Sequence, residues 1–293
     1  MSSTPDRLKA VSVRLFTYLV LITAVVYFVI PLFWLVVSST KTDGDLASTF
    51  GLWFGSRNAF VDNVERVFTA SNGLFTVWLR NTIFYSTVSA VGAALVATAA
   101  GYGFAKYRFR GRTVLLASIL VSVAVPATIL IVPLFLLLSA MGLVNTPWAF
   151  ILPSMVNPFG VYLMWIFAEE TLPNELVEAA RVDGASEFRT FRSIALPLLV
   201  PGFVTVLLFS FVSTWNNYFL PLLVFSKQDL FPLTVGLAQW NFQASSSTGG
   251  GAVYATFSMV ITGSLIAVIP LAAGFLLLQR YWQRGLTMGS VKG

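Results

Sequence analysis

Long apolar stretches alternate with short charged segments along the chain. Between Arg14 and Lys41 lie 26 uncharged residues, and between Arg80 and Lys106 lie 25. A helix needs about 20 mostly apolar residues to cross a hydrocarbon core of about 30 Å. Each of these two stretches therefore predicts one membrane-spanning helix, and the first covers residues 15–37.

The rest of the chain adds four more predicted spans. The 56 uncharged residues between Arg112 and Glu169 suffice for two helices, separated by the turn at 141–147 where Gly, Asn and Pro end a helix. A fifth span is expected to begin near Gly202, and a sixth to cover about 255–278. The predicted regions are an N-terminal tail, a six-helix transmembrane region and a C-terminal tail, over residues 1–14, 15–279 and 280–293.

The positive charges indicate how the spans are oriented. Thirteen of the 18 lysines and arginines fall on the two tails and on the connections after the second and fourth spans, and five fall on the opposite connections. Positive residues concentrate on the cytoplasmic side of membrane proteins. We therefore expect both termini in the cytoplasm.

The composition excludes several classes of protein. With 57% hydrophobic and 10% charged residues, the chain is not a soluble domain. A net charge of +6 would suggest nucleic acid in a soluble protein, but here the membrane explains it and no nucleic acid is expected. The chain has no Cys and no His, which excludes disulfides, Cys/His metal sites and Ser-His-Asp triads. We predict no catalytic residue and no metal ligand.

The spans also lack the groups that power transport. No Asp, Glu, Lys or Arg lies well inside a predicted span, so no carboxylate is available to carry a proton across the membrane. The chain contains no G-x-x-x-x-G-K-[ST] phosphate loop for binding ATP. Uphill transport would therefore need energy from another polypeptide. A self-sufficient channel or secondary carrier remains the alternative.

The longest cytoplasmic connection, residues 169–200, has a helical pattern. Asn174 is placed to cap a short helix over 175–183, and Gly184 is placed to end it because glycine adopts positive φ at low cost. A second, amphipathic helix follows, and Leu196-Pro197 is expected to end it. Such a pair is either a surface-lying packing element or a docking element for a cytoplasmic partner.

The identities within this connection match the pattern E-A-A-x3-G-x9-I-x-L-P. The fixed positions are Glu178, Ala179, Ala180, Gly184, Ile194, Leu196 and Pro197. This resembles the EAA loop of permease subunits of bacterial ABC importers. The runs 101–112, 215–217 and 284–293 are similar to the carbohydrate-uptake branch, in particular to the smaller, six-span permease of maltose-type transporters.

The resemblance implies an all-α integral membrane protein with the fold of a type I ABC importer permease and a cytoplasmic coupling helix. It implies a subunit of an ATP-driven sugar importer in the bacterial cytoplasmic (inner) membrane. An oligosaccharide is the favoured solute, and polyols and glycerol phosphates are alternatives. The chain would not be an enzyme and would bind no cofactor, with ATP and Mg on partner subunits. The implied partners are a second permease, two ATP-binding subunits and an extracytoplasmic solute-binding protein.

The resemblance also assigns candidate site residues. Those that would couple to the ATPase are Glu178, Ala179, Ala180, Asp183, Gly184 and Pro197. Those of the C-terminal tail that would contact the ATPase are Thr287, Gly289, Val291 and Lys292. Asn157, Asn216 and Asn217 either line a solute path or bond a neighbouring helix, and we favour interhelical bonds. Trp240, Asn241 and Gln243 lie in an outer loop that is either a flexible connector or a contact of the binding protein, with Trp240 as a stacking face.

Overall fold

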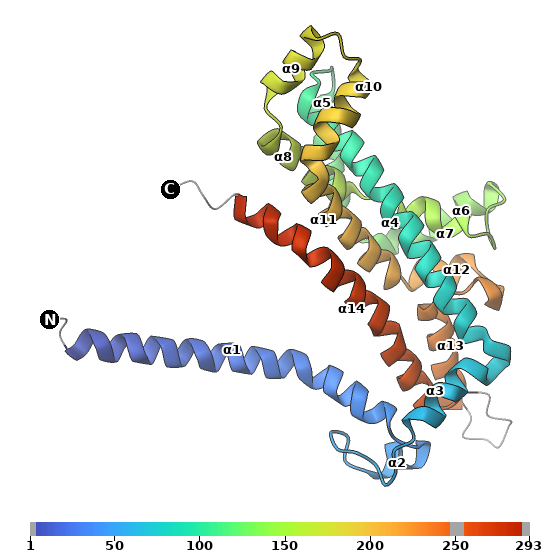
Figure 1. Cartoon of the computed structure of the whole chain (residues 1–293). Coiled ribbons are helices and arrows are strands. Elements are labelled where there is room, and N and C mark those ends of the chain that lie inside the picture. Colours follow the sequence, from blue (N-terminus) through green and yellow to red (C-terminus); the bar gives the residue numbers. More distant parts are fainter. Residues whose placement is uncertain (1–3, 247–254, 289–293) are drawn as a thin grey trace. The chain divides into compact units, whose positions relative to one another are not determined.

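The computed structural model describes residues 4–246 and 255–288, and in these ranges it contains helices and loops and no strand (Figure 1). The α-helices are α1 (Thr4–Ser39), α2 (Asp43–Ser48), α3 (Phe60–Thr69), α4 (Leu74–Lys106), α5 (Arg112–Val123), α6 (Ile131–Ala140), α7 (Trp148–Ser154), α8 (Pro158–Thr171), α9 (Asn174–Val182), α10 (Glu187–Thr190), α11 (Leu196–Trp215), α12 (Phe219–Val224), α13 (Leu233–Ser246) and α14 (Phe257–Met288). The shorter helical turns are η1 (Ala70–Gly73), η2 (Ala127–Leu130), η3 (Phe191–Ala195) and η4 (Gln228–Leu230), of which η3 is a π-helix.

Five helical stretches of the described chain are long and apolar enough to cross a membrane. They are Val11–Ser39, Phe60–Lys106, Trp148–Thr171, Glu187–Trp215 and Phe257–Leu277. The predicted third span is different, because α5 and α6 meet at 98° instead of forming one straight helix. The predicted count of six is reached when this bent pair is taken as one span.

Pro126 explains why the third span is broken. It lies between α5 and η2, it has no N–H to donate, and it disfavours the helical conformation of the residue before it. The sequence predicts one span here, and the structure divides it into two helices at this proline.

The boundaries near the EAA pattern also needed correction. Pro173, in an extended conformation, precedes the first turn of α9, so Asn174 is a helical residue and not the cap. Leu196-Pro197 does not end the second helix, since the chain continues from α10 through the π-turn η3 into α11. Pro197 lies in the first turn of α11, directly after the π-turn, where the helical hydrogen-bond pattern changes and its missing N–H is accommodated.

The chain divides into two compact units, residues 73–239 with 267–293, and residues 1–72 with 240–266. In the first unit, α4, α8 and α11 lie side by side and form the core (Figure 1). Met164, Ala168 and Leu199 are fully buried there. A Cβ placed on Gly101 of α4 would lie 2.6 Å from the Cβ of Met164 on α8, so only glycine permits this approach of the two helices.

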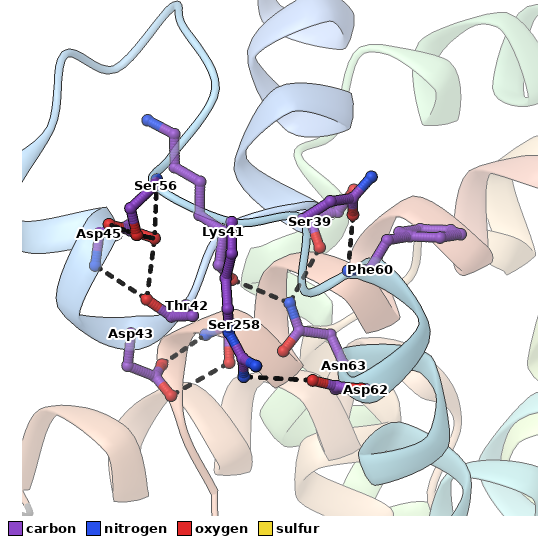
Figure 2. A network of polar contacts seen from close by, with 12 residues as sticks. Ser39, Lys41, Thr42, Asp43, Asp45, Ser56, Phe60, Asp62, Asn63 and Ser258 are labelled. Atoms are coloured by element: carbon purple, nitrogen blue, oxygen red, sulfur yellow. Dashed lines mark hydrogen bonds and ion pairs between the residues drawn. The ribbon is translucent and has the colours of Figure 1, made fainter.

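The second unit is held by polar contacts where α1 ends (Figure 2). Asn63 Nδ2 donates to the carbonyl oxygens of Ser39 and Lys41, at 2.9 Å each. Ser258 N donates to Asp43 Oδ1 at 2.9 Å. Helix ends leave carbonyl groups without intrahelical partners, and Asn63 supplies a donor to one of them, the carbonyl of Ser39. The buried Asn63 thereby joins α3 to the end of α1.

Replacing Gly101 with valine is expected to destabilise the helix core. The added side chain would overlap Met164 and force α4 from α8, at a cost of about 1–3 kcal/mol typical of overpacking. The matched control is Gly103→Val on the same helix, where an added Cβ meets nothing within 4 Å. Thermal unfolding in detergent should show a lower midpoint for Gly101→Val than for Gly103→Val; equal midpoints would contradict the packing argument.

Candidate functional site

The short helix α9 is shaped by a buried face and a glycine stop. Val177 and Ala180 are buried against the bundle, at 3% and 5% exposure. Gly184 follows with φ of 76°, and its N–H donates to the carbonyl of Arg181 while that of Ala185 donates to Ala180. This is the turn in which a left-handed residue satisfies the last carbonyls of a helix. The predicted stop at Gly184 is therefore confirmed.

The outer face of α9 carries the predicted coupling residues. Glu178, Ala179 and Asp183 are exposed there. Val182 is 88% exposed on the same helix, and Phe188 is 72% exposed on α10. Exposed apolar side chains beside an acidic one are typical of a surface that meets another protein. Ala180 faces the bundle instead, so its small size serves packing within the chain.

Pro197 stands apart from the other coupling candidates. It belongs to the first turn of α11, after the π-turn that follows α10. It therefore does not contribute to the outer face of α9. Its position instead sets how the chain enters the fifth span.

The end of α4 holds α9 through Lys106. Its ammonium group donates to the carbonyl of Leu172 and, at 2.9 Å, to Oδ1 of Asn174. Leu172 precedes α9 and Asn174 is its first residue. Lys106 therefore joins the end of one long span to the start of the short helix.

Tyr107, the residue after α4, makes a second link, to Glu187 at the start of α10. Its hydroxyl donates to Oε2 of Glu187 at 2.5 Å, and Arg181 Nε donates to Oε1 of the same carboxylate at 2.8 Å. Burial, and then the bond to Glu187, raise the pKa of Tyr107, so the hydroxyl stays a donor throughout the physiological range. Arg181 also lies 5.9 Å from the centre of the Tyr107 ring. The carboxylate of Glu187 therefore accepts hydrogen bonds both from Tyr107 at the end of α4 and from Arg181 of α9.

Sequence reasoning missed Lys106, Tyr107 and Glu187. In the sequence Lys106 counts only as one of the positive residues that orient the spans, and its partners lie 66 and 68 positions away in the chain. Nothing local in the sequence pairs residues across that separation. The adjacent Lys and Tyr at the end of the second span were the available signal.

The candidate solute-path asparagines make mostly local bonds. Asn216 Nδ2 donates to the carbonyl of Val212 in its own helix at 2.9 Å. The Asn217 side chain accepts from Leu220 N at 3.4 Å, just beyond the end of α11. The favoured interhelical side-chain bonds are therefore absent for these two within the described residues. Asn157 does make one, donating to Ser210 Oγ on α11 at 2.8 Å.

The outer segment after η4 is helical over α13, so its interpretation as a flexible connector was wrong there. Trp240 is only 2% exposed, and it cannot present a stacking face to an outside ligand. Asn241 is exposed and Gln243 is half-buried on the same helix.

Gly289, Val291 and Lys292 lie outside the described residues. Thr287 belongs to α14, which continues past the predicted end at Leu278.

Removing the Tyr107 hydroxyl is expected to loosen α9 and α10. Tyr107→Phe deletes the bond to Glu187, a hydrogen bond to a partly exposed carboxylate worth about 1 kcal/mol. Hydrogen exchange should become faster at the amides of α9 and α10 and stay unchanged in the buried turns of α4. The control is Tyr162→Phe on α8, whose hydroxyl makes no hydrogen bond within the described residues; unchanged exchange in Tyr107→Phe would contradict the link.

Comparison with known families adds the decisive observation. Residues 95–284, which include α8 to α11 and the EAA pattern, match the family described as the binding-protein-dependent transport system inner membrane component. The chain belongs to this family. It is accordingly a multi-pass membrane protein and a permease of the ABC transporter class.

Individual relatives agree along nearly the whole chain. The chain is 35% identical to the arabinooligosaccharides transport system permease protein AraQ of Halalkalibacterium halodurans, covering 90% of this chain and 91% of that protein. It is 30% identical to the lactose transport system permease protein LacG of Rhizobium radiobacter, covering 94% and 95%. It is 28% identical to the diacetylchitobiose uptake system permease protein DasC of Streptomyces coelicolor, covering 93% and 96%.

A solved structure shares the fold. A chain of a bacterial ABC transporter involved in the import of the acidic polysaccharide alginate superposes with a TM-score of 0.79, over 96% of this chain and 99% of that chain. The two sequences are 22% identical. The predicted all-α fold of an ABC importer permease is therefore confirmed.

Proposed function

We propose that the chain is the transmembrane permease subunit of an ATP-driven oligosaccharide importer, and that α9 is where a cytoplasmic ATPase drives it. The supporting observation is that α9 exposes Glu178, Ala179 and Val182 on one side while its other contacts hold it to the spans. The apolar side chain of Val182, 88% exposed, has no cover from the described helices of this chain.

The contacts of α9 suggest how a push on it reaches the membrane. The helix is joined through Leu172 to α8 and through the Gly184 turn to α10 and α11. Lys106 and Tyr107 add polar links to the end of α4. A displacement of α9 therefore acts on α4, α8 and α11 together. These helices form one closely packed core, so they are expected to move as a body when the partner's subunits close on ATP.

The partners follow from the family and from what the chain lacks. The family is a component of binding-protein-dependent transport systems, and this supports an extracytoplasmic solute-binding protein, a second permease and two ATP-binding subunits that carry ATP and Mg. The chain itself would perform no covalent chemistry. A self-sufficient channel or secondary carrier is disfavoured, because the family is one component of a transport system with several parts.

The solute class is inferred from the relatives. Three of them are described as permeases for arabinooligosaccharides, lactose and diacetylchitobiose, and all three solutes are short saccharides. A neutral oligosaccharide is therefore favoured over polyols and glycerol phosphates. Asn157 is half-buried and already donates to Ser210, and Asn216 is exposed, so Asn216 is the better candidate for a solute contact.

Reversing the charge at Glu178 is expected to abolish coupling. A charge-assisted bond to a partner is worth roughly 1.5–3 kcal/mol, so its loss weakens association by about one to two orders of magnitude. Glu178→Arg should lose solute uptake and co-purification of the ATPase while its amount in the membrane stays normal. The matched control is Glu170→Arg, which reverses an exposed charge on α8 instead of α9. Normal uptake by Glu178→Arg with the ATPase bound would refute the role of α9.

The orientation is tested directly, because the chain has no cysteine of its own. We place the termini and α9 in the cytoplasm and α2 on the outer side. A membrane-impermeant maleimide should modify Ser48→Cys in intact spheroplasts, and Ala185→Cys only after the membrane is permeabilised. Reaction of the 185 variant from outside would reverse the assigned topology.

A further inference from the structure

Three aromatic side chains stand exposed on the loop that joins α2 to α3. We call residues 49–56 the aromatic loop. Phe50, Trp53 and Phe54 are 73%, 67% and 52% exposed, and the rings of Trp53 and Phe54 meet edge to face with their centres 6.0 Å apart. No residue of the loop is charged. Such a cluster is costly in water and marks a surface that meets an apolar or interfacial environment.

The backbone of the aromatic loop is fixed at both ends. Lys41, only 1% exposed, donates from Nζ to the carbonyl of Phe50 at 2.8 Å. The carboxylate of Asp45 accepts from Ser56 N at 3.3 Å and from Ser56 Oγ at 3.0 Å (Figure 2). These bonds also lower the pKa of Asp45, the side-chain bond from Ser56 most of all. The aromatic side chains are therefore held outward by a pinned backbone and do not fold onto the unit.

The loop folds back along α1. A Cβ on Gly51 would lie 3.5 Å from Nε1 of Trp34, a residue inside the apolar span Val11–Ser39. Trp34 precedes Ser39 by roughly 7 Å along the helix axis, at about 1.5 Å per residue. In Figure 1 the chain after α2 turns back beside the last turns of α1. The aromatic loop thus reaches the level at which the apolar part of α1 ends.

We propose that the aromatic loop is a membrane anchor, whose Phe50, Trp53 and Phe54 side chains insert among the lipid headgroups of the leaflet in which α1 ends. Aromatic side chains are enriched at this boundary, since the ring is apolar and the indole N–H still finds polar partners. The exposed aromatic surface also continues from Phe33 and Trp34 of α1, both more than 40% exposed. A flat apolar surface with no charge to select a protein partner suits lipid.

The anchor would fix the outer end of α1. Lys41, two residues after α1, binds the loop at the carbonyl of Phe50, and Asn63 of α3 donates to the carbonyls of Ser39 and Lys41. A loop held in the headgroups therefore restrains the depth and tilt of α1 and the position of α3 while other helices move. This role is independent of which solute is carried and of how α9 meets an ATPase.

Site-specific fluorescence can locate the loop. A chain without native cysteine allows Trp53→Cys and, independently, Phe54→Cys to be labelled with an environment-sensitive nitrobenzoxadiazole dye. The labelled chain is assembled with cysteine-free partner subunits in phosphatidylcholine–phosphatidylglycerol nanodiscs. Quenching is then measured with lipids that carry a nitroxide near the headgroup, and separately with iodide in the water. Ala47→Cys, exposed on α2, and Phe28→Cys, 71% exposed on α1, are the comparison sites.

The anchor predicts strong lipid-nitroxide quenching, weak iodide quenching and a blue-shifted emission at positions 53 and 54, relative to position 47. Strong iodide quenching that falls when the solute-binding protein is added would overturn the proposal in favour of a protein-docking surface. Protection from both quenchers would also overturn it, because the loop would then be covered by another subunit. The proposal requires the same quenching pattern at positions 53 and 54.

Discussion

The absence of water from the membrane interior is the constraint on which the rest of this structure depends. Inside lipid every backbone N–H and C=O must find a partner within the protein, so the spans are helices and their charged residues lie at the ends. Strong polar contacts between distant residues are consequently concentrated where helices leave the membrane. Lys106 and Tyr107 at the end of α4, and Asn63 of α3 at the end of α1, are examples.

In each of the two units, such contacts hold an exposed surface in place. The contacts of Lys106 and Tyr107 hold α9 by its start and by the carboxylate that follows its turn, and leave its outer face uncovered. The contacts of Lys41 and Asp45 hold the aromatic loop by its two ends and leave its side chains uncovered. In both cases hydrogen bonds fix the position of the backbone. The side chains on the exposed surface have no partner within the described chain.

The errors of sequence reasoning share one cause. Asn174, Pro197 and Trp240 were each interpreted from local preference: a capping amide, a helix-ending proline and a stacking ring. In the structure Asn174 accepts from Lys106, Pro197 lies in the first turn of α11 after a π-turn, and Trp240 is buried. For Asn174, the neighbour that decided its use came from 68 positions away in the chain.

The amino-acid sequence by itself determined the class of protein, the number and approximate position of the spans, the stop at Gly184 and the family, because these follow from hydrophobic length and from short local patterns. Only the tertiary structure decided that α5 and α6 are sharply bent, that Ala180 faces inward while Ala179 faces outward, and that the aromatic loop returns to Trp34. Those outcomes depend on which helices approach one another, and the packing of side chains between distant segments sets that approach.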